Sequence, residues 1–394
     1  MGETRAVVVV GLGGLGSAAA YWLARQGIDV VGLEQFELGH VRGASHDHSR
    51  IIRRSYHTPG YVDLAGEAYD AWRSVEADGD LEIITRTGGV DLFPADAAID
   101  ADTYTTSLSA AGVPFEWIDG DEVRRRWSGF GRGSLAPDVH AIQCDDTGIV
   151  PAGRATASLQ RLASEHGADL RAHSPVRELR PIDGEVDVVI ERAAGVEVIR
   201  AGHVVVTADA WTNRLLAPLG HEIPLAVTRE QVSYFPHADL DRFAIGRLPV
   251  WIWMDDPSFY GFPVYGVTDA VKGAEDCGGA EVDPDTRTFD PDAGMEHRLA
   301  TFMEDLLGSG MGAPRTTTCL YTLTSDRDFV CGRVPGVPQV SVALGAAHGF
   351  KFASWFGREL AALATGADVR PELQPFSMER PSLYAPISRE AWLV

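Results

Sequence analysis

The sequence of 394 residues lacks the features that mark several large classes of proteins. It has no run of about 18 apolar residues, so no membrane-spanning helix is expected. Its basic residues are outnumbered, 34 Lys and Arg against 56 Asp and Glu, and the net charge of −22 argues against nucleic acid and anionic membranes as partners. It has four cysteines, none in a C-x-x-C pair or a disulfide framework. These absences predict a protein of the reducing cytoplasm without a metal site.

What the sequence does have begins at its amino end, with a glycine motif between two apolar runs. Val7–Val10 leads into Gly11-x-Gly13-x-x-Gly16, a helical pattern follows, and a second apolar run ends at Glu34. In this pattern the first glycine permits a tight turn, the second lets a pyrophosphate approach the backbone, and the third lets helix and strand pack closely. The acid at the end of the second run suits a ribose diol. We therefore predict a dinucleotide-binding βαβ unit, for either NAD or FAD.

The length of the chain and its 45% apolar content suit two domains. No repeat or low-complexity linker separates them, so we expect them to be interwoven. The predicted fold is α/β, with a Rossmann-like dinucleotide-binding domain and an α+β substrate domain on a mainly antiparallel sheet. The first domain is assigned residues 1–85, 145–225 and 315–394, and the second 86–144 and 226–314. Within the first, we expect three meander strands in 176–200 and a separate core strand at 203–207.

A basic cluster follows the first unit of this acidic chain. Its members, within nine residues, are His46, His48, Arg50, Arg53 and Arg54. A solvated loop is one interpretation. We favour an anion site, because cations beside a dinucleotide fold often face phosphate or carboxylate.

A second glycine-rich turn lies near the carboxyl end, in Gly345-Ala-Ala-His348-Gly349. It joins a strand pattern to a helix pattern that ends at Gly366. Its backbone N–H groups are a second place where a cofactor could be held.

Several stretches together resemble the family of monomeric sarcosine oxidase and N-methyltryptophan oxidase, flavoenzymes similar in fold to glycine oxidase and D-amino acid oxidase. The resemblance runs nearly end to end, and it is the order and spacing of the motifs that carry it. The motifs are the amino-terminal glycines with Glu34, Ser45-His46 before Arg50-Ile-Ile-Arg53, Tyr260-Gly-Phe-Pro263 before Lys272, Cys319-Leu-Tyr321-Thr, His348-Gly-Phe-Lys-Phe-Ala353, and Phe376-Ser-Met-Glu-Arg-Pro381.

The resemblance implies FAD as the cofactor, attached by a thioether between Cys319 and the flavin 8α-methyl group. Considered alone, Cys319 would more often be a buried structural thiol. The same resemblance places Ser45, His46 and Arg50 beside the cofactor, together with the turn that ends in Lys351.

For the substrate, the resemblance implies that Arg53 and Lys351 hold an amino acid carboxylate, by a guanidinium fork and an ammonium charge. Lys272 would face the flavin and activate O₂, because a fixed cation stabilises developing superoxide. Tyr260 and Tyr321 would line the substrate pocket. Asp276 stands where relatives have a histidine, and would pair with a substrate cation or point to solvent.

The implied reaction oxidises the C–N bond of a secondary amino acid, N-methyl or cyclic, to an imine while O₂ is reduced to H₂O₂. An amine-deaminating oxidase or a dehydrogenase on the same FAD fold is an alternative. An NAD(P)-dependent dehydrogenase and a non-catalytic binding protein are further ones, although the presence of Arg53, Lys272, Cys319 and Lys351 argues against the last. The resemblance suggests a monomer.

Overall fold

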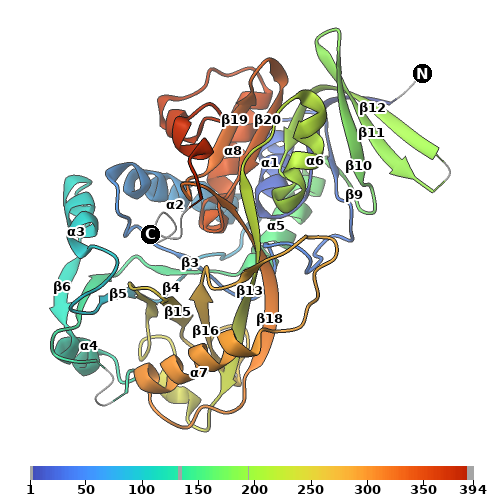
Figure 1. Ribbon diagram of the computed structural model, residues 1–394. Coiled ribbons are helices and arrows are strands. Elements are labelled where there is room, and N and C mark those ends of the chain that lie inside the picture. The colour runs from blue at the N-terminus through green and yellow to red at the C-terminus, as the bar shows by residue number, and fades with distance from the viewer. Residues whose placement is uncertain (1–2, 132–134, 194, 388–394) are drawn as a thin grey trace.

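A computed structural model describes residues 3–131, 135–193 and 195–387. These residues form two regions, each built on a large sheet, with a small third sheet near their junction (Figure 1). The parallel core of the first sheet has the order β9-β2-β1-β12-β20, and β10, β11 and β19 extend it by antiparallel pairing. Its strands are β1 (Glu3–Val10), β2 (Val30–Leu33), β9 (Asp169–Arg171), β10 (Val176–Ile182), β11 (Glu185–Arg192), β12 (Gly195–Val206), β19 (Val330–Val334) and β20 (Val337–Leu344).

Helices cover one face of the parallel core. The antiparallel strands β10 and β11 share a hydrophobic core with its other face. Val7–Val10 is completely buried, as expected for a parallel strand enclosed on both faces. The helices of the chain are α1 (Gly14–Arg25), α2 (Pro59–Gly79), α3 (Ala101–Ala110), α4 (Gly120–Arg126), α5 (Ala152–Glu165), α6 (Thr212–Leu216), α7 (Ala293–Leu307) and α8 (Ala353–Ala364). Among them α1, α2, α5 and α8 share one core with the sheet, whereas α6 packs on the opposite face.

One expectation for the first sheet is wrong. The third meander strand and the core strand are a single strand, β12, which pairs with β11 in its first half and with β20 in its second. Gly202 lies at the change of partner, and a side chain there would come within 3.1 Å of the Ala6 carbonyl oxygen. Gly202 therefore permits close strand packing where β12 changes partner.

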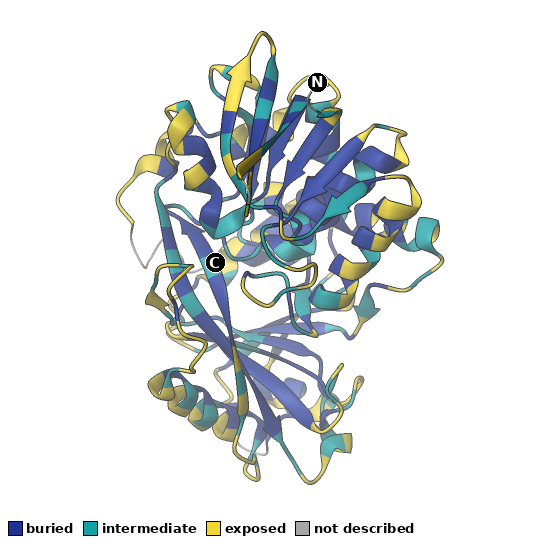
Figure 2. Ribbon diagram, turned by 90° about the vertical axis from the view of Figure 1, so that its right-hand side faces the viewer, coloured by how far each residue is buried: buried dark blue, intermediate teal, exposed yellow. Residues whose placement is uncertain are grey.

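The second sheet has nine strands, and all its pairings are antiparallel except β5 with β14. Helix α7 covers it, and Leu299 and Met303 pack against Trp251. In Figure 2 the outer face of α7 is exposed and the strands above it are buried. The strands are β5 (Gly89–Phe93), β6 (Glu116–Asp119), β7 (His140–Cys144), β13 (Leu225–Pro236), β14 (Val250–Trp253), β15 (Ser258–Phe262), β16 (Ala270–Asp276), β17 (Ala280–Glu281) and β18 (Arg315–Thr324).

These α/β regions confirm the predicted fold class. The domain boundaries stay a prediction, but one strand lies on the other side of them: β18 pairs along its whole length with β13 of the second sheet, although residue 315 onward was assigned to the first domain. The third sheet holds β3 (Arg50–Ile52), β8 (Gly148–Val150) and β4 (Thr85–Arg86). Short 3-10 helices complete the chain: Asp209–Trp211, Ala217–Leu219, Leu240–Phe243, Gly349–Phe352, Pro371–Phe376 and Pro381–Tyr384.

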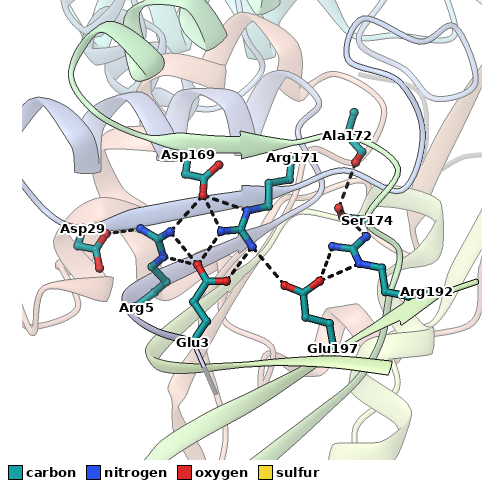
Figure 3. A network of polar contacts seen from close by, with 9 residues as sticks. All are labelled: Glu3, Arg5, Asp29, Asp169, Arg171, Ala172, Ser174, Arg192 and Glu197. Carbon is teal, nitrogen blue, oxygen red and sulfur yellow. Dashed lines mark hydrogen bonds and ion pairs between the residues drawn. The ribbon is translucent and has the colours of Figure 1, made fainter. Parts of the chain in front are cut away.

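The two ends of the parallel strands differ in chemistry. Glu3 and Arg5, at the amino end of β1, form a network of ion pairs with Asp169 and Arg171 of β9 (Figure 3). Hydrogen bonds from Arg171 hold the pKa of the Glu3 carboxyl at about 2 despite partial burial. Ligands of α/β sheets bind outside the carboxyl ends, so this network serves the sheet and leaves the opposite end for a site. Among the described residues, no helix is both long and apolar enough to cross a membrane.

Candidate active site

Two joined cavities occupy the carboxyl end of the parallel strands. One extends past Glu34 and His40, and the other reaches the second sheet at Cys319 and ends near Lys351. Together they make one elongated cleft, which suits a dinucleotide lying across the crevice of an α/β sheet. The residues common to both cavities are Gly13, Ala44, Ser45, Thr207 and Asp209.

The glycine motif forms a tight turn at this junction. Gly11 has φ +90°, and a side chain on Gly16 would come within 1.8 Å of the Gly11 carbonyl oxygen, so both positions require glycine. Gly13 caps α1, and the Gly14 N–H donates to Ser45 Oγ at 2.8 Å. The positive end of α1 therefore faces the cleft beside Ser45, in the arrangement that binds pyrophosphate.

Glu34 follows β2 and lines the same cavity. Its carboxylate accepts hydrogen bonds from the backbone N–H groups of Leu12, at 2.9 Å, and Phe36, at 3.0 Å. Burial opposes its ionisation, but these bonds and His40 at 3.4 Å keep its pKa below the usual value. Glu34 is thus an ionised acceptor that also organises the glycine turn, and its contact with a ribose stays a prediction.

The second predicted turn, after β20, borders the other cavity. A side chain on Gly345 would come within 2.9 Å of Gly349 Cα. His348 donates from Nε2 to the Arg327 carbonyl oxygen at 3.0 Å, and its Nδ1 has no hydrogen-bond partner among the described residues. Burial and the nearby Lys351 keep the pKa of His348 well below its usual value, so the ring is neutral.

Cys319 and Arg50 line the second cavity, and the buried His46, which lines neither cavity, lies near Arg50. Burial raises the pKa of the Cys319 thiol to about 11, although the Arg50 guanidinium opposes this shift. Burial and Arg50 lower the pKa of His46 to about 4, so His46 is not one of the cations of the predicted anion site. His46 Nε2 is buried and has no partner among the described residues. His48 and Arg54 do not appear among the residues that line the cleft.

The chain contains two lysines: Lys272 is buried beside this cleft, and Lys351, which lines the cleft, is half-buried. Lys272, on β16, donates to Asp47 Oδ2 at 2.6 Å and to Ser49 at its carbonyl oxygen and Oγ. Burial lowers the pKa of Lys272 to about 8, and Asp47 opposes the shift. Lys272 does not line the cavity itself.

Lys351 lies among cations at the far end of the pocket. Its Nζ donates to the His348 carbonyl oxygen at 3.2 Å, and no described carboxylate forms an ion pair with it. Burial, followed by the charges of Arg53 and Arg327, keeps its pKa well below the usual value. Arg53 has its own partner, Asp91, at 3.0 Å. The predicted carboxylate-binding residues are thus close together and favour an anion.

A chain of polar contacts forms the opposite wall. Arg327 Nη2 donates to Asp276 Oδ2 at 2.7 Å, and the Tyr321 hydroxyl donates to Asp276 Oδ1 at 3.2 Å. Tyr260 and Tyr321 place their hydroxyl oxygens 3.5 Å apart. Asp276 therefore does not point to solvent, and its partner in the protein is Arg327.

Three residues of this site were not found from the sequence: Asp47, Asp91 and Arg327. Asp47 lies inside the basic cluster, with φ +84°, and the lone acid among cations was the available signal. Asp91 and Arg327 carry no such signal, because their partners lie far away in sequence. Asp209 also belongs to this site: it has φ +48° and lines both cavities, and burial raises its pKa to about 6.

Two features of the cleft in this structure fit a bound FAD. Gly13, at the amino end of α1, lines both cavities, where a phosphate would meet the helix terminus, and the buried His348 Nδ1 borders the pocket without a partner among the described residues. An elongated cleft at the carboxyl end of a parallel sheet, with a glycine turn at a helix amino end, is typical of dinucleotide-binding proteins.

Comparisons with known proteins agree. Residues 6–363 match the family model described as FAD dependent oxidoreductase. The chain is 34% identical, over 388 residues, to a monomeric sarcosine oxidase of Streptomyces avermitilis, which covers 94% of this chain and 96% of that one. It is 26% identical to an N-methyl-L-tryptophan oxidase of Salmonella heidelberg, over 95% of this chain and 98% of that one. A solved structure of NikD, an unusual amino acid oxidase essential for nikkomycin biosynthesis, is similar with a TM-score of 0.84 and 27% identity, over 95% and 97% of the two chains.

The chain therefore belongs to the FAD-dependent oxidoreductase family. It is an FAD-dependent amino acid oxidase of the sarcosine oxidase type, which acts on CH–NH bonds. The resemblance seen in the sequence is confirmed, and the nicotinamide-dependent alternative is set aside.

Proposed function

We propose that the protein oxidises a secondary amino acid, N-methyl or cyclic, at its C–N bond to give an imine. The observation that carries this proposal is Lys351: a half-buried ammonium that lines the pocket beside two arginines, with no carboxylate ion pair among the described residues. A charge held largely out of water requires a partner, and a substrate carboxylate would supply it. Relatives named for sarcosine and N-methyl-L-tryptophan support a secondary amine.

In this proposal each wall of the pocket has its own task. Arg53 and Lys351 hold the carboxylate, while Tyr260 and Tyr321 border the substrate from the second sheet. Asp276, engaged by Arg327, shapes this wall and is not the counter-ion of the amine. Bound FAD would take up the two electrons removed from the C–N unit and deliver them to O₂, which with two protons becomes H₂O₂.

We further propose that FAD is attached covalently through Cys319. Cys319 lines the cleft, whereas Cys331 is buried in β19 outside it. Because burial favours the neutral thiol, its reaction would depend on Arg50, the adjacent cation that stabilises a thiolate.

The test is an absorption spectrum before and after acid precipitation, followed by a substrate panel. Flavin colour should stay in the pellet, Cys319→Ala should release it, and the matched Cys331→Ala should not. Colour that leaves wild-type protein with the acid would refute the thioether and leave the oxidase assignment unchanged.

The panel compares sarcosine, other N-methyl amino acids and proline with primary amino acids, and measures H₂O₂ and imine-derived products. We expect kcat/KM to be at least tenfold higher for the secondary amines. A preference for primary amines would instead favour the deaminating alternative. A monomer and a cytoplasmic location stay predictions.

A further inference from the structure

Lys272 uses its whole hydrogen-bonding capacity inside the protein. Its ammonium has three N–H donors, and the structure provides three acceptors: Asp47 Oδ2 at 2.6 Å, the Ser49 carbonyl oxygen at 3.1 Å and Ser49 Oγ at 3.0 Å. The aromatic ring of Phe262 lies under the charge at 4.8 Å. The direction of the ammonium is therefore fixed, and none of its protons is left for a ligand.

Asp47 is itself held in place by its surroundings. The Tyr234 hydroxyl donates to its second oxygen, and Arg50 Nη1 lies 3.6 Å from Oδ2. Its backbone is left-handed, at φ +84°, a conformation that aspartate tolerates better than most residues. Burial opposes its charge, but Lys272 and Arg50 keep its pKa well below the usual value, so Asp47 is ionised.

Among the charged and titratable groups that face Lys272, Asp47 is the acid that forms an ion pair with it. The others are Arg50 from β3, the neutral His46, Tyr234 from β13 and the Cys319 thiol from β18. Burial and the like charge of Arg50 both favour the neutral amine, whereas Asp47 favours the ammonium. Without Asp47, the buried lysine would lose its proton at a lower pH.

We infer that Asp47 keeps Lys272 charged and fixes its direction, so that Lys272 acts on O₂ through its charge and not as a hydrogen-bond donor. Asp47 is in this sense a positioning residue. The inference rests on the proposed function, in which O₂ is the electron acceptor and Lys272 promotes its reduction. A fixed cation in a dry site stabilises developing superoxide without reorganising.

The small number of lysines allows a direct test on the flavin-loaded protein. Lysine labelled with ¹³C at Cε and ¹⁵N at Nζ gives two sites, and the signal missing from Lys272→Met is that of Lys272. We expect Lys272 to titrate near pH 8 in the wild type. Asp47→Asn should lower this midpoint by about one to three pH units, because an opposite charge at such a distance has an effect of that size. Asp47→Gly, which suits the left-handed backbone, is the second variant.

The functional readout is the rate at which reduced flavin is reoxidised by O₂, followed from pH 6 to 9. Lys272→Met should slow it at every pH. Asp47→Asn should slow it by about 5- to 50-fold at pH 8, since the wild type is then about half charged and a midpoint one to two units lower leaves about a tenth to a hundredth of the lysine charged. The loss should diminish toward pH 6. Tyr234→Phe, which removes a partner of Asp47 and keeps the ion pair, is the control and should move the midpoint by less than half a unit.

The outcomes separate the two levels of the argument. If Lys272→Met slows reoxidation but the Asp47 variants leave the lysine midpoint and the pH profile unchanged, the inference about Asp47 is overturned and the proposed function stands. If Lys272→Met has no effect, O₂ is not activated at Lys272, and both the acceptor assignment and this inference fail.

Discussion

The two lysines of this chain, the buried Lys272 and the half-buried Lys351, stand in opposite electrostatic surroundings. Lys272 contacts a carboxylate, Asp47, at 2.6 Å. Lys351 contacts a carbonyl oxygen, and the charges that most affect its pKa are those of Arg53 and Arg327. Burial lowers the pKa of both, but the partner decides how far: Lys272 titrates at about 8, and Lys351 well below its usual value.

This difference assigns the two ammonium groups different tasks. A cation with its own counter-ion remains in place whether or not a ligand is bound, which suits a permanent field beside the flavin. A cation without one gains most from an arriving anion, which suits a receptor for the substrate carboxylate. Apart from these two lysines, the Lys and Arg residues of the chain are all arginines, whose charge cannot be removed at ordinary pH. The two titratable cations of this class therefore both lie at the site.

The largest effect is expected from Lys351→Met, which keeps the length of the side chain and removes its charge. Losing one partner of a buried charge pair costs about 2–5 kcal/mol, so kcat/KM should fall by about 30-fold or more. The fall should appear mainly in KM, and acetate should weaken in parallel as a competitive inhibitor. Lys351→Arg is the control and should recover part of the affinity. An unchanged KM would show that the carboxylate is held elsewhere, and the contrast between the lysines would lose its meaning.

Arg327→Gln should give a smaller effect, a shift in the pKa of Lys351. The direction of this shift tests how the neighbouring charges act on Lys351. Removing a like charge, and releasing Asp276 from its pair, raises the pKa of Lys351. Because anion binding needs the ammonium, the pH at which acetate binding weakens should move upward by about one unit. The Lys351 NMR signal should move with it.

Arg315→Gln is the matched control for this variant, since it removes an exposed guanidinium from β18 outside the cleft. It should leave both readouts unchanged. A downward shift in Arg327→Gln would mean that lost packing outweighs the lost charge.

Sequence patterns were sufficient where the determinants are local. The turn at Gly11–Gly16, the acid Glu34 and the turn at Gly345–Gly349 each depend on neighbours within one βαβ unit or one turn, so glycine spacing predicted them. The strands between them followed from apolar runs, except that the single strand β12 was predicted as two strands. The pairing of β18 with β13 was beyond reach, because strand order depends on contacts between distant segments.

The partners of the charged residues could not be predicted for the same reason. Lys272 and Asp47 are 225 positions apart, and Arg327 and Asp276 are 51 apart. Which carboxylate meets which cation depends on the packing of both sheets. The motifs therefore identified Arg53, Lys272 and Lys351 but not Arg327. The structure was needed to show that Lys272 and Arg53 have internal partners whereas Lys351 does not form an ion pair within the described residues.

The smallest effect is expected from Ser49→Ala, which removes one of the three acceptors of Lys272 and keeps its carboxylate. A hydrogen bond from a charged donor contributes about 1.5–3 kcal/mol, but a rotated ammonium can recover part of this with the Ser49 carbonyl oxygen. We therefore expect the Lys272 midpoint to fall by less than one pH unit and reoxidation at pH 8 to slow by about two- to fivefold. The same labelled-lysine titration measures it. If Ser49→Ala shifted the midpoint as far as Asp47→Asn, hydrogen bonding rather than the ion pair would keep Lys272 charged, and the difference between the two lysines would be one of hydrogen bonds instead of charge.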